Sequence, residues 1–146
     1  MGLPLRLMRR LQLVQNGAAR LITGVKKFQH ISLTLANLHW LLVCFLINFK
    51  VMMITFKALN GLGPPYLSEC LLPARSVRNT CSSQAGRLRA LIPKEAQRER
   101  KRNWTFSAVT PCLWNNLPIE IRLAPLLDGF KTALKTWLFH QAFPEH

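Results

Sequence analysis

The chain has 146 residues, 49% of them hydrophobic, which suits a single globular domain and excludes a wholly disordered chain. Its 20 basic and 6 acidic residues give a net charge of +14, a balance that favours polyanions as partners. The basic excess lies in segments 1–27 and 75–103, whereas 104–146 carries no net charge.

The first predicted element is an amphipathic helix over Leu5–Thr23, which Gly24 ends. Apolar residues recur there at three- and four-residue spacing, so we expect the stripe to pack into the core and the arginines to face solvent. The stripe consists of Leu7, Leu11, Val14, Ala18, Leu21 and Ile22. The opposite side carries Arg6, Arg9, Arg10 and Arg20.

A polar link follows, and Ser32 is expected to cap a short helix that ends at Leu38. The next predicted helix, over His39–Leu59, is long and apolar. A shorter helix over Tyr66–Leu72 follows the chain-breaking run from Gly63 to Pro65.

The apolar run 38–56 raises the question of a membrane span. His39, Asn48, Lys50 and Thr55 interrupt it, and a lysine at the centre of a spanning helix costs about 2.5–3.5 kcal/mol. Because a span needs roughly 20 mainly apolar residues, we favour a buried core helix.

Segment 75–103 is predicted to be irregular and basic, with a short strand at Leu88–Ile92. Beyond it, Thr110 and Pro111 resemble the N-cap and first residue of a brief helix that stops at Leu117-Pro118, and a turn over Ile119–Arg122 follows.

The last predicted helix runs from Asp128, as its N-cap, to about Ala142. Its apolar face comprises Phe130, Leu134, Trp137 and Leu138, with Lys131 and Lys135 off that face.

The predicted fold is therefore all-α. It is a small helical array around one long central apolar helix, with an irregular basic segment between the N- and C-terminal parts. We expect a single domain over 1–143, formed by helical halves 1–74 and 104–143 with the partly disordered connector 75–103. Large aromatic side chains dominate buried area, so the expected anchors are Trp40, Trp114 and Trp137.

The strongest predicted interaction site is the run Arg98–Arg102, because lysine and arginine neutralise phosphates with little dependence on sequence. Trp104 follows and could stack on an unpaired base. A solvated charge run and a nuclear-import signal remain alternative interpretations. The nucleic-acid contact candidates are Arg87, Arg89, Lys94, Arg98, Arg100, Lys101, Arg102, Trp104, Arg6, Arg9, Arg10 and Arg20.

The basic N-terminal helix also fits a mitochondrial presequence or a helix on a membrane surface. The corresponding alternative function is a membrane-associated or mitochondrially targeted protein that uses helix 1–24 and the apolar run 38–56. A core helix with a solvated arginine face is the simpler interpretation.

No constellation for catalysis stands out in the sequence. Glu95 and Glu99 lie among arginines, Asp128 is explained as a cap, and no Ser/His/Asp set, Cys/His set or phosphate loop occurs. The four cysteines form no CxxC pair and the histidines have no ligand spacing. We therefore expect a non-enzymatic, intracellular chain without cofactor, metal or disulfide.

Four stretches carry a family resemblance. They are RLQLVQNGAARLITG (Arg10–Gly24), LANLHWL (Leu35–Leu41), INFKVMMITFKALNGLGPPYLSECL (Ile47–Leu71) and SAVTPCLWNNLPIEIRLAPLLDGFKTALKTWLF (Ser107–Phe139). In this order they resemble the region downstream of the polymerase in non-LTR (LINE-type) retrotransposon polyproteins. Leu42, Cys44 and Leu46 depart from the proline and arginines that the family usually has after its His-Trp-Leu motif.

The resemblance implies that polymerase and nuclease parts would lie upstream and that this region helps to hold an RNA template. The leading hypothesis is thus a noncatalytic LINE-derived fragment, nuclear or cytoplasmic, that binds nucleic acid nonspecifically and RNA in preference to DNA. A third hypothesis is that the chain is a drifting transposon copy with no selected function.

Overall fold

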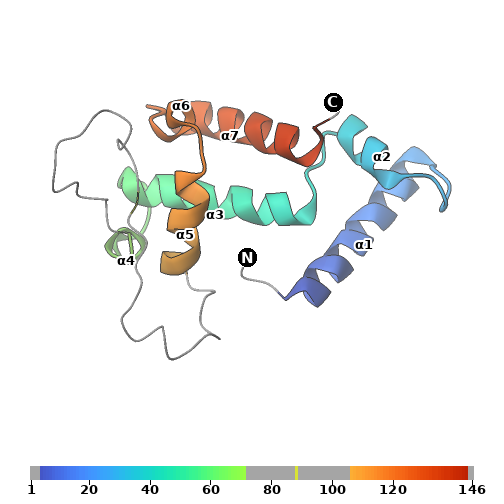
Figure 1. The fold of residues 1–146 in the computed structure, drawn as a ribbon, viewed down its shortest axis with the longest axis horizontal. Coiled ribbons are helices and arrows are strands. Elements are labelled where there is room, and N and C mark those ends of the chain that lie inside the picture. The colour runs from blue at the N-terminus through green and yellow to red at the C-terminus, as the bar shows by residue number, and fades with distance from the viewer. Residues whose placement is uncertain (1–3, 72–87, 89–105, 145–146) are drawn as a thin grey trace. The chain divides into compact units, whose positions relative to one another are not determined.

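The computed structural model describes residues 4–71, 88 and 106–144 (Figure 1). Every regular element in those ranges is a helix, which confirms the all-α prediction. The helices are α1 (Leu5–Thr23), α2 (Ile31–Asn37), α3 (Val43–Leu59), α4 (Pro65–Glu69), α5 (Phe106–Asn115), α6 (Ile119–Arg122) and α7 (Leu127–Ala142).

The chain divides into two compact units. Residues 3–49 and 134–146 form one, here called the α1–α2 unit, and residues 1–2 and 50–133 form the other, the α4–α6 unit. The helices α3 and α7 each contribute residues to both. A single domain over 1–143 stays a prediction, and the connector 75–103 lies outside the described residues apart from Leu88.

Helix α1 has the predicted bounds. Gly24 adopts a left-handed φ of 69° and its N–H donates to the Arg20 carbonyl at 2.8 Å, so glycine closes the helix as expected. The orientation of α1 differs from the prediction, because most of its apolar stripe, from Leu7 to Ile22, is exposed and only Ala19 is buried.

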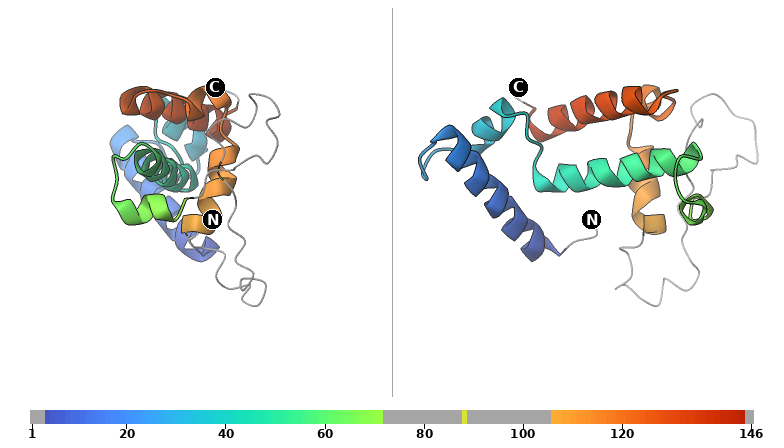
Figure 2. Two further views of the ribbon diagram at one scale, coloured as in Figure 1. Left: turned by 90° about the vertical axis from the view of Figure 1, so that its left-hand side faces the viewer. Right: turned by 180° about the vertical axis from the view of Figure 1, so that it is seen from behind.

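In the α1–α2 unit, α2 turns back from the end of α1 and contacts it (Figure 2). Ala19, Leu35, Ala36 and Phe143 form the buried core. Small alanines on both helices allow this close approach, and the half-buried Trp40 packs against the cluster, as an anchor should.

Helix α2 ends in a Schellman motif that the sequence prediction missed. The Trp40 N–H donates to the Leu35 carbonyl and the His39 N–H to the Ala36 carbonyl, both at 2.9 Å. His39 takes the left-handed position, with φ of 53°, so it follows α2 and does not begin α3. The predicted cap at Ser32 is also wrong, because α2 begins at Ile31 after His30 and has no side-chain cap.

Helix α3 therefore begins at Val43, four residues later than predicted. The Val43 N–H donates to the side-chain carbonyl of Gln12 at 2.9 Å, so a side chain of α1 caps α3. Its buried residues are Met52, Thr55, Phe56 and Ala58. Among the described helices, none combines the length and apolar character that crossing a membrane requires.

Aromatic stacking organises the α4–α6 unit. Phe130 is fully buried and stacks on Phe56 with ring centroids 4.3 Å apart. The ring of Trp114 is tilted against Phe130, with centroids 5.7 Å apart. Trp114 is itself buried, which confirms the prediction that it anchors the core. Other buried residues of this unit include Leu71, Leu88, Leu117 and Ile121.

Four predicted helix boundaries need correction. Helix α5 begins at Phe106, so Pro111 lies inside it and not at its first position. It ends at Asn115, before the predicted stop at Leu117. Helix α7 begins at Leu127, so Asp128 lies in its first turn, where a carboxylate favours the helix dipole. Helix α4 runs over Pro65–Glu69 and ends before Leu72.

The predicted apolar face of α7 is confirmed. Phe130, Leu134 and Leu138 are buried, Trp137 is half-buried, and Lys131 and Lys135 are exposed.

Candidate nucleic-acid interface

The predicted contact residues fall into two groups. The arginines of α1 are described, whereas those between 87 and 104 lie outside the described residues. Arg6, Arg9 and Arg10 are exposed on α1 and free to meet a ligand.

Arg20 has a different role from its neighbours. It is half-buried, and its guanidinium donates to the backbone carbonyls of Lys26 and Gln29, the latter at 3.1 Å. Arg20 therefore holds the loop between α1 and α2, and fewer of its donors remain for a phosphate.

The described part of the α1–α2 unit carries charge of one sign. Every Lys, Arg, Asp and Glu among residues 3–49 and 134–144 is a cation, so the described part of this unit contains no carboxylate to neutralise them. These cations are Arg6, Arg9, Arg10, Arg20, Lys26, Lys27 and Lys135. An unbalanced group of cations raises the local concentration of anions and speeds their association.

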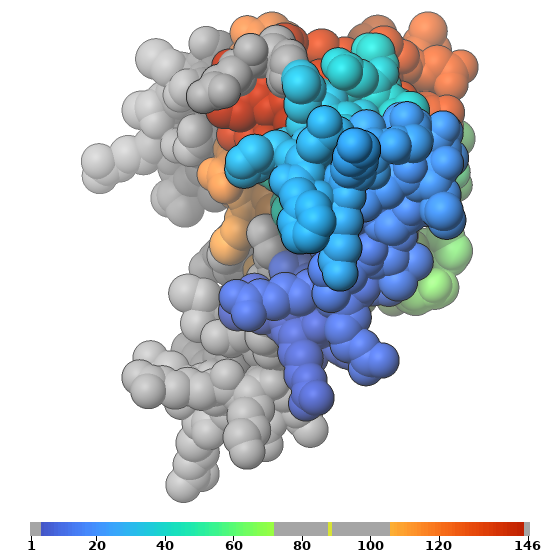
Figure 3. Space-filling model, turned by 90° about the vertical axis from the view of Figure 1, so that its right-hand side faces the viewer, coloured from blue at the N-terminus to red at the C-terminus, as the bar shows by residue number. Residues whose placement is uncertain are grey.

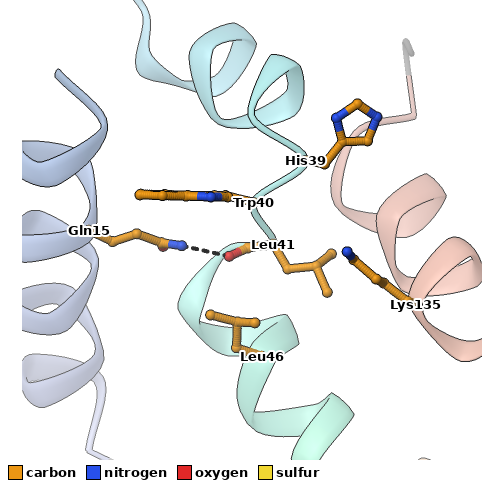
Figure 4. Close-up of a pocket in the computed structure, with 6 residues that line it drawn as sticks. All are labelled: Gln15, His39, Trp40, Leu41, Leu46 and Lys135. Carbon is orange, nitrogen blue, oxygen red and sulfur yellow. Dashed lines mark hydrogen bonds between the residues drawn. The ribbon is translucent and has the colours of Figure 1, made fainter. Parts of the chain in front are cut away.

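The same unit contains a pocket of about 300 Å³. It is lined by Gln15, His39, Trp40, Leu41, Leu46 and Lys135 (Figure 4). Figure 4 shows the Trp40 indole above Leu46, with Gln15 reaching in from α1 on one side and Lys135 from α7 on the other.

Hydrogen bonding and stacking fix two walls of the pocket. The Gln15 amide donates to the Leu41 carbonyl at 2.8 Å, which ties α1 to the start of α3. His39 stacks on Phe139 with ring centroids 5.6 Å apart and an interplanar angle of 19°. Lys135 is exposed, so its flexible ammonium can follow an anion.

The pocket combines an aromatic ring, an apolar floor and one mobile cation. That combination suits a flat ring that carries a nearby negative charge, such as a base with its phosphate. The sequence prediction placed His39 at the start of a helix, which is wrong, and it missed the pocket, because Lys135 is distant in sequence from Gln15 and Trp40.

In the ranges 4–71 and 106–144, no group of three His, Cys, Asp or Glu side chains is placed to hold a metal ion. Cys44, Cys70 and Cys112 are free thiols, and Cys44 is half-buried, as a small apolar residue would be.

Comparison of the chain with protein-family models, with curated proteins and with solved structures finds no match.

Proposed function

We propose that the chain is a noncatalytic nucleic-acid-binding protein that holds single-stranded RNA, and DNA less well, without sequence preference. The observation that carries the proposal is that every charged side chain in the described part of the α1–α2 unit is a cation. The resemblance to the region downstream of a LINE-type polymerase supports it, and with that origin we place the protein in the nucleus or the cytoplasm.

The cations of α1 supply the phosphate contacts. Arg6, Arg9 and Arg10 lie within two helical turns and no carboxylate competes for them within the described part of their unit. Each phosphate that is neutralised releases counterions, so on a single strand the slope of log affinity against log salt changes by about 0.7 per contact. The affinity should therefore fall steeply as salt is added.

The pocket supplies the preference for unpaired bases. Trp40 offers a ring on which a base can stack, and such stacking is worth about 1–3 kcal/mol per base. A base in a duplex is already stacked on its neighbours and cannot enter, so double-stranded competitors should displace a single strand poorly.

Fluorescence anisotropy with a labelled uridine oligonucleotide tests the proposal. Affinity should drop strongly between about 50 and 200 mM salt, and binding that ignores salt would contradict it. The double variant Arg9→Gln/Arg10→Gln should reduce the salt slope by about 1.4, twice the value for one contact.

A matched control separates a local surface from net charge. Lys57 and Lys131 are exposed and belong to the α4–α6 unit, so Lys57→Gln/Lys131→Gln removes the same charge elsewhere. It should bind nearly as the parent does. Equal weakening by the two double variants would show that only total charge matters, and the assigned surface would be wrong.

A further inference from the structure

The exposed apolar stripe of α1 is the feature that nucleic-acid binding leaves unexplained. Leu11 is 48% exposed, Val14 72%, Leu21 87% and Ile22 64%. In a helix of a globular protein a stripe with this spacing normally faces the core. Figure 3 shows α1, in blue, uncovered along the side that faces the viewer.

The outward orientation is fixed by polar contacts on another side of the helix. Gln12 accepts from the Val43 N–H and Gln15 donates to the Leu41 carbonyl, while Ala19 is the residue that packs against the core. Rotating α1 to bury the leucines would break both hydrogen bonds, so the stripe stays at the surface.

Cations border this stripe on one flank. At 3.6 residues per turn, Arg10 and Arg6 lie roughly 70° and 110° around the helix from the centre of the stripe, whereas Arg9 lies roughly 170° away, nearly opposite it. Helix α1 contains no Asp or Glu. One side of α1 is therefore apolar, the next side is cationic, and the third side packs against the rest of the α1–α2 unit.

The loop after α1 adds a second apolar group beside cations. Phe28 is 95% exposed, and it follows Lys26 and Lys27. Because the Arg20 guanidinium binds the carbonyls of Lys26 and Gln29, on either side of Phe28, this loop is held in shape with the ring outward.

We propose that α1 is an interfacial helix that lies flat on an anionic lipid bilayer. The stripe enters the boundary between headgroups and acyl chains, the bordering arginines contact the anionic headgroups, and Phe28 inserts as a second anchor. A bilayer of this kind is apolar and anionic at once, which matches both sides of α1.

Other binding partners would complement only one of these two sides of the helix. A nucleic acid would pair with the arginines but would leave the leucines in water. A second copy would cover the leucines but would bring two carboxylate-free cationic helices together, and like charges repel. The inference stands on the stripe and not on nucleic-acid binding, so either can fail alone.

Co-sedimentation of the full chain with vesicles tests the inference. Vesicles of phosphatidylcholine with phosphatidylserine should bind it, and pure phosphatidylcholine vesicles should bind it much more weakly, by about fivefold for each cation at the surface. Failure to sediment with the phosphatidylserine vesicles would overturn the proposal.

The stripe is tested by Val14→Gln/Leu21→Gln, which keeps the charge and should weaken vesicle binding by at least about tenfold. The control is Leu13→Gln, because Leu13 is 69% exposed but lies on the arginine side of the helix. It should sediment like the parent. Circular dichroism and thermal unfolding check that all three proteins fold alike.

Three results would refute the stripe as a membrane contact. The double variant could sediment like the parent, which would make binding purely electrostatic. Leu13→Gln could lose as much, which would show no preferred face. Sedimentation velocity without lipid could reveal a dimer that the double variant abolishes, which would assign the stripe to a second copy.

Discussion

Phe130→Ala should destabilise the α4–α6 unit more than any other single truncation on α7. Phe130 has no exposed surface, and its ring stacks on Phe56 at 4.3 Å and lies 5.7 Å from Trp114. Truncating a buried phenylalanine costs about 3–5 kcal/mol, and each aromatic pair contributes about 0.5–1.5 kcal/mol beyond area. We expect a loss near the upper end, about 4–5 kcal/mol.

The matched control is Phe139→Ala, on the same helix in the α1–α2 unit. Phe139 is only half-buried and contacts His39 at 5.6 Å and Phe143 at 5.0 Å, so we expect a loss of about 2 kcal/mol. Urea unfolding followed by tryptophan fluorescence measures both values. If Phe130→Ala costs less than about 1.5 kcal/mol, or no more than the control, the stack does not organise its unit.

Four further substitutions test other parts of the structure. Gly24→Ala should destabilise α1 by about 1–2 kcal/mol, because a side chain is strained at φ of 69° although it would meet nothing within 4 Å. Gly17→Ala should stabilise the same helix by about 0.5–1 kcal/mol. Melting temperatures of the two variants that shift in the same direction would contradict this. Gln12→Ala leaves the Val43 N–H without its acceptor and should cost about 1 kcal/mol, and an unchanged urea midpoint would show that this cap does not matter. Lys135→Gln should weaken uridine-oligonucleotide binding by about threefold to tenfold without changing the melting temperature, and equal anisotropy titrations would remove Lys135 from the interface.

The two proposals for α1 predict that anionic lipid and RNA compete for the same arginines. Phosphatidylserine headgroups and RNA phosphates would both use Arg6, Arg9 and Arg10, whereas only lipid uses the leucine stripe. Anionic vesicles should therefore displace RNA from the parent protein. Val14→Gln/Leu21→Gln should keep RNA binding and resist this displacement.

Sequence signals that act within a few residues were sufficient to predict those helix bounds and apolar faces that local interactions determine. The bounds of α1 follow from its repeating apolar residues and from Gly24, the residue with least strain at positive φ. The face of α7 follows from the spacing of Phe130, Leu134 and Leu138. The all-α class rests on several such segments, each long enough for its period to be read.

Tertiary contacts determined the features that the sequence failed to predict. His39 is read locally as the start of a helix, yet the chain accepts a left-handed histidine there because Trp40 and Leu35 close a Schellman motif. The stripe of α1 was expected inside, but Gln12 and Gln15 bind backbone groups of distant residues and turn a different side inward. A helical period shows that one face is apolar; which face is buried depends on partners that lie far away along the chain.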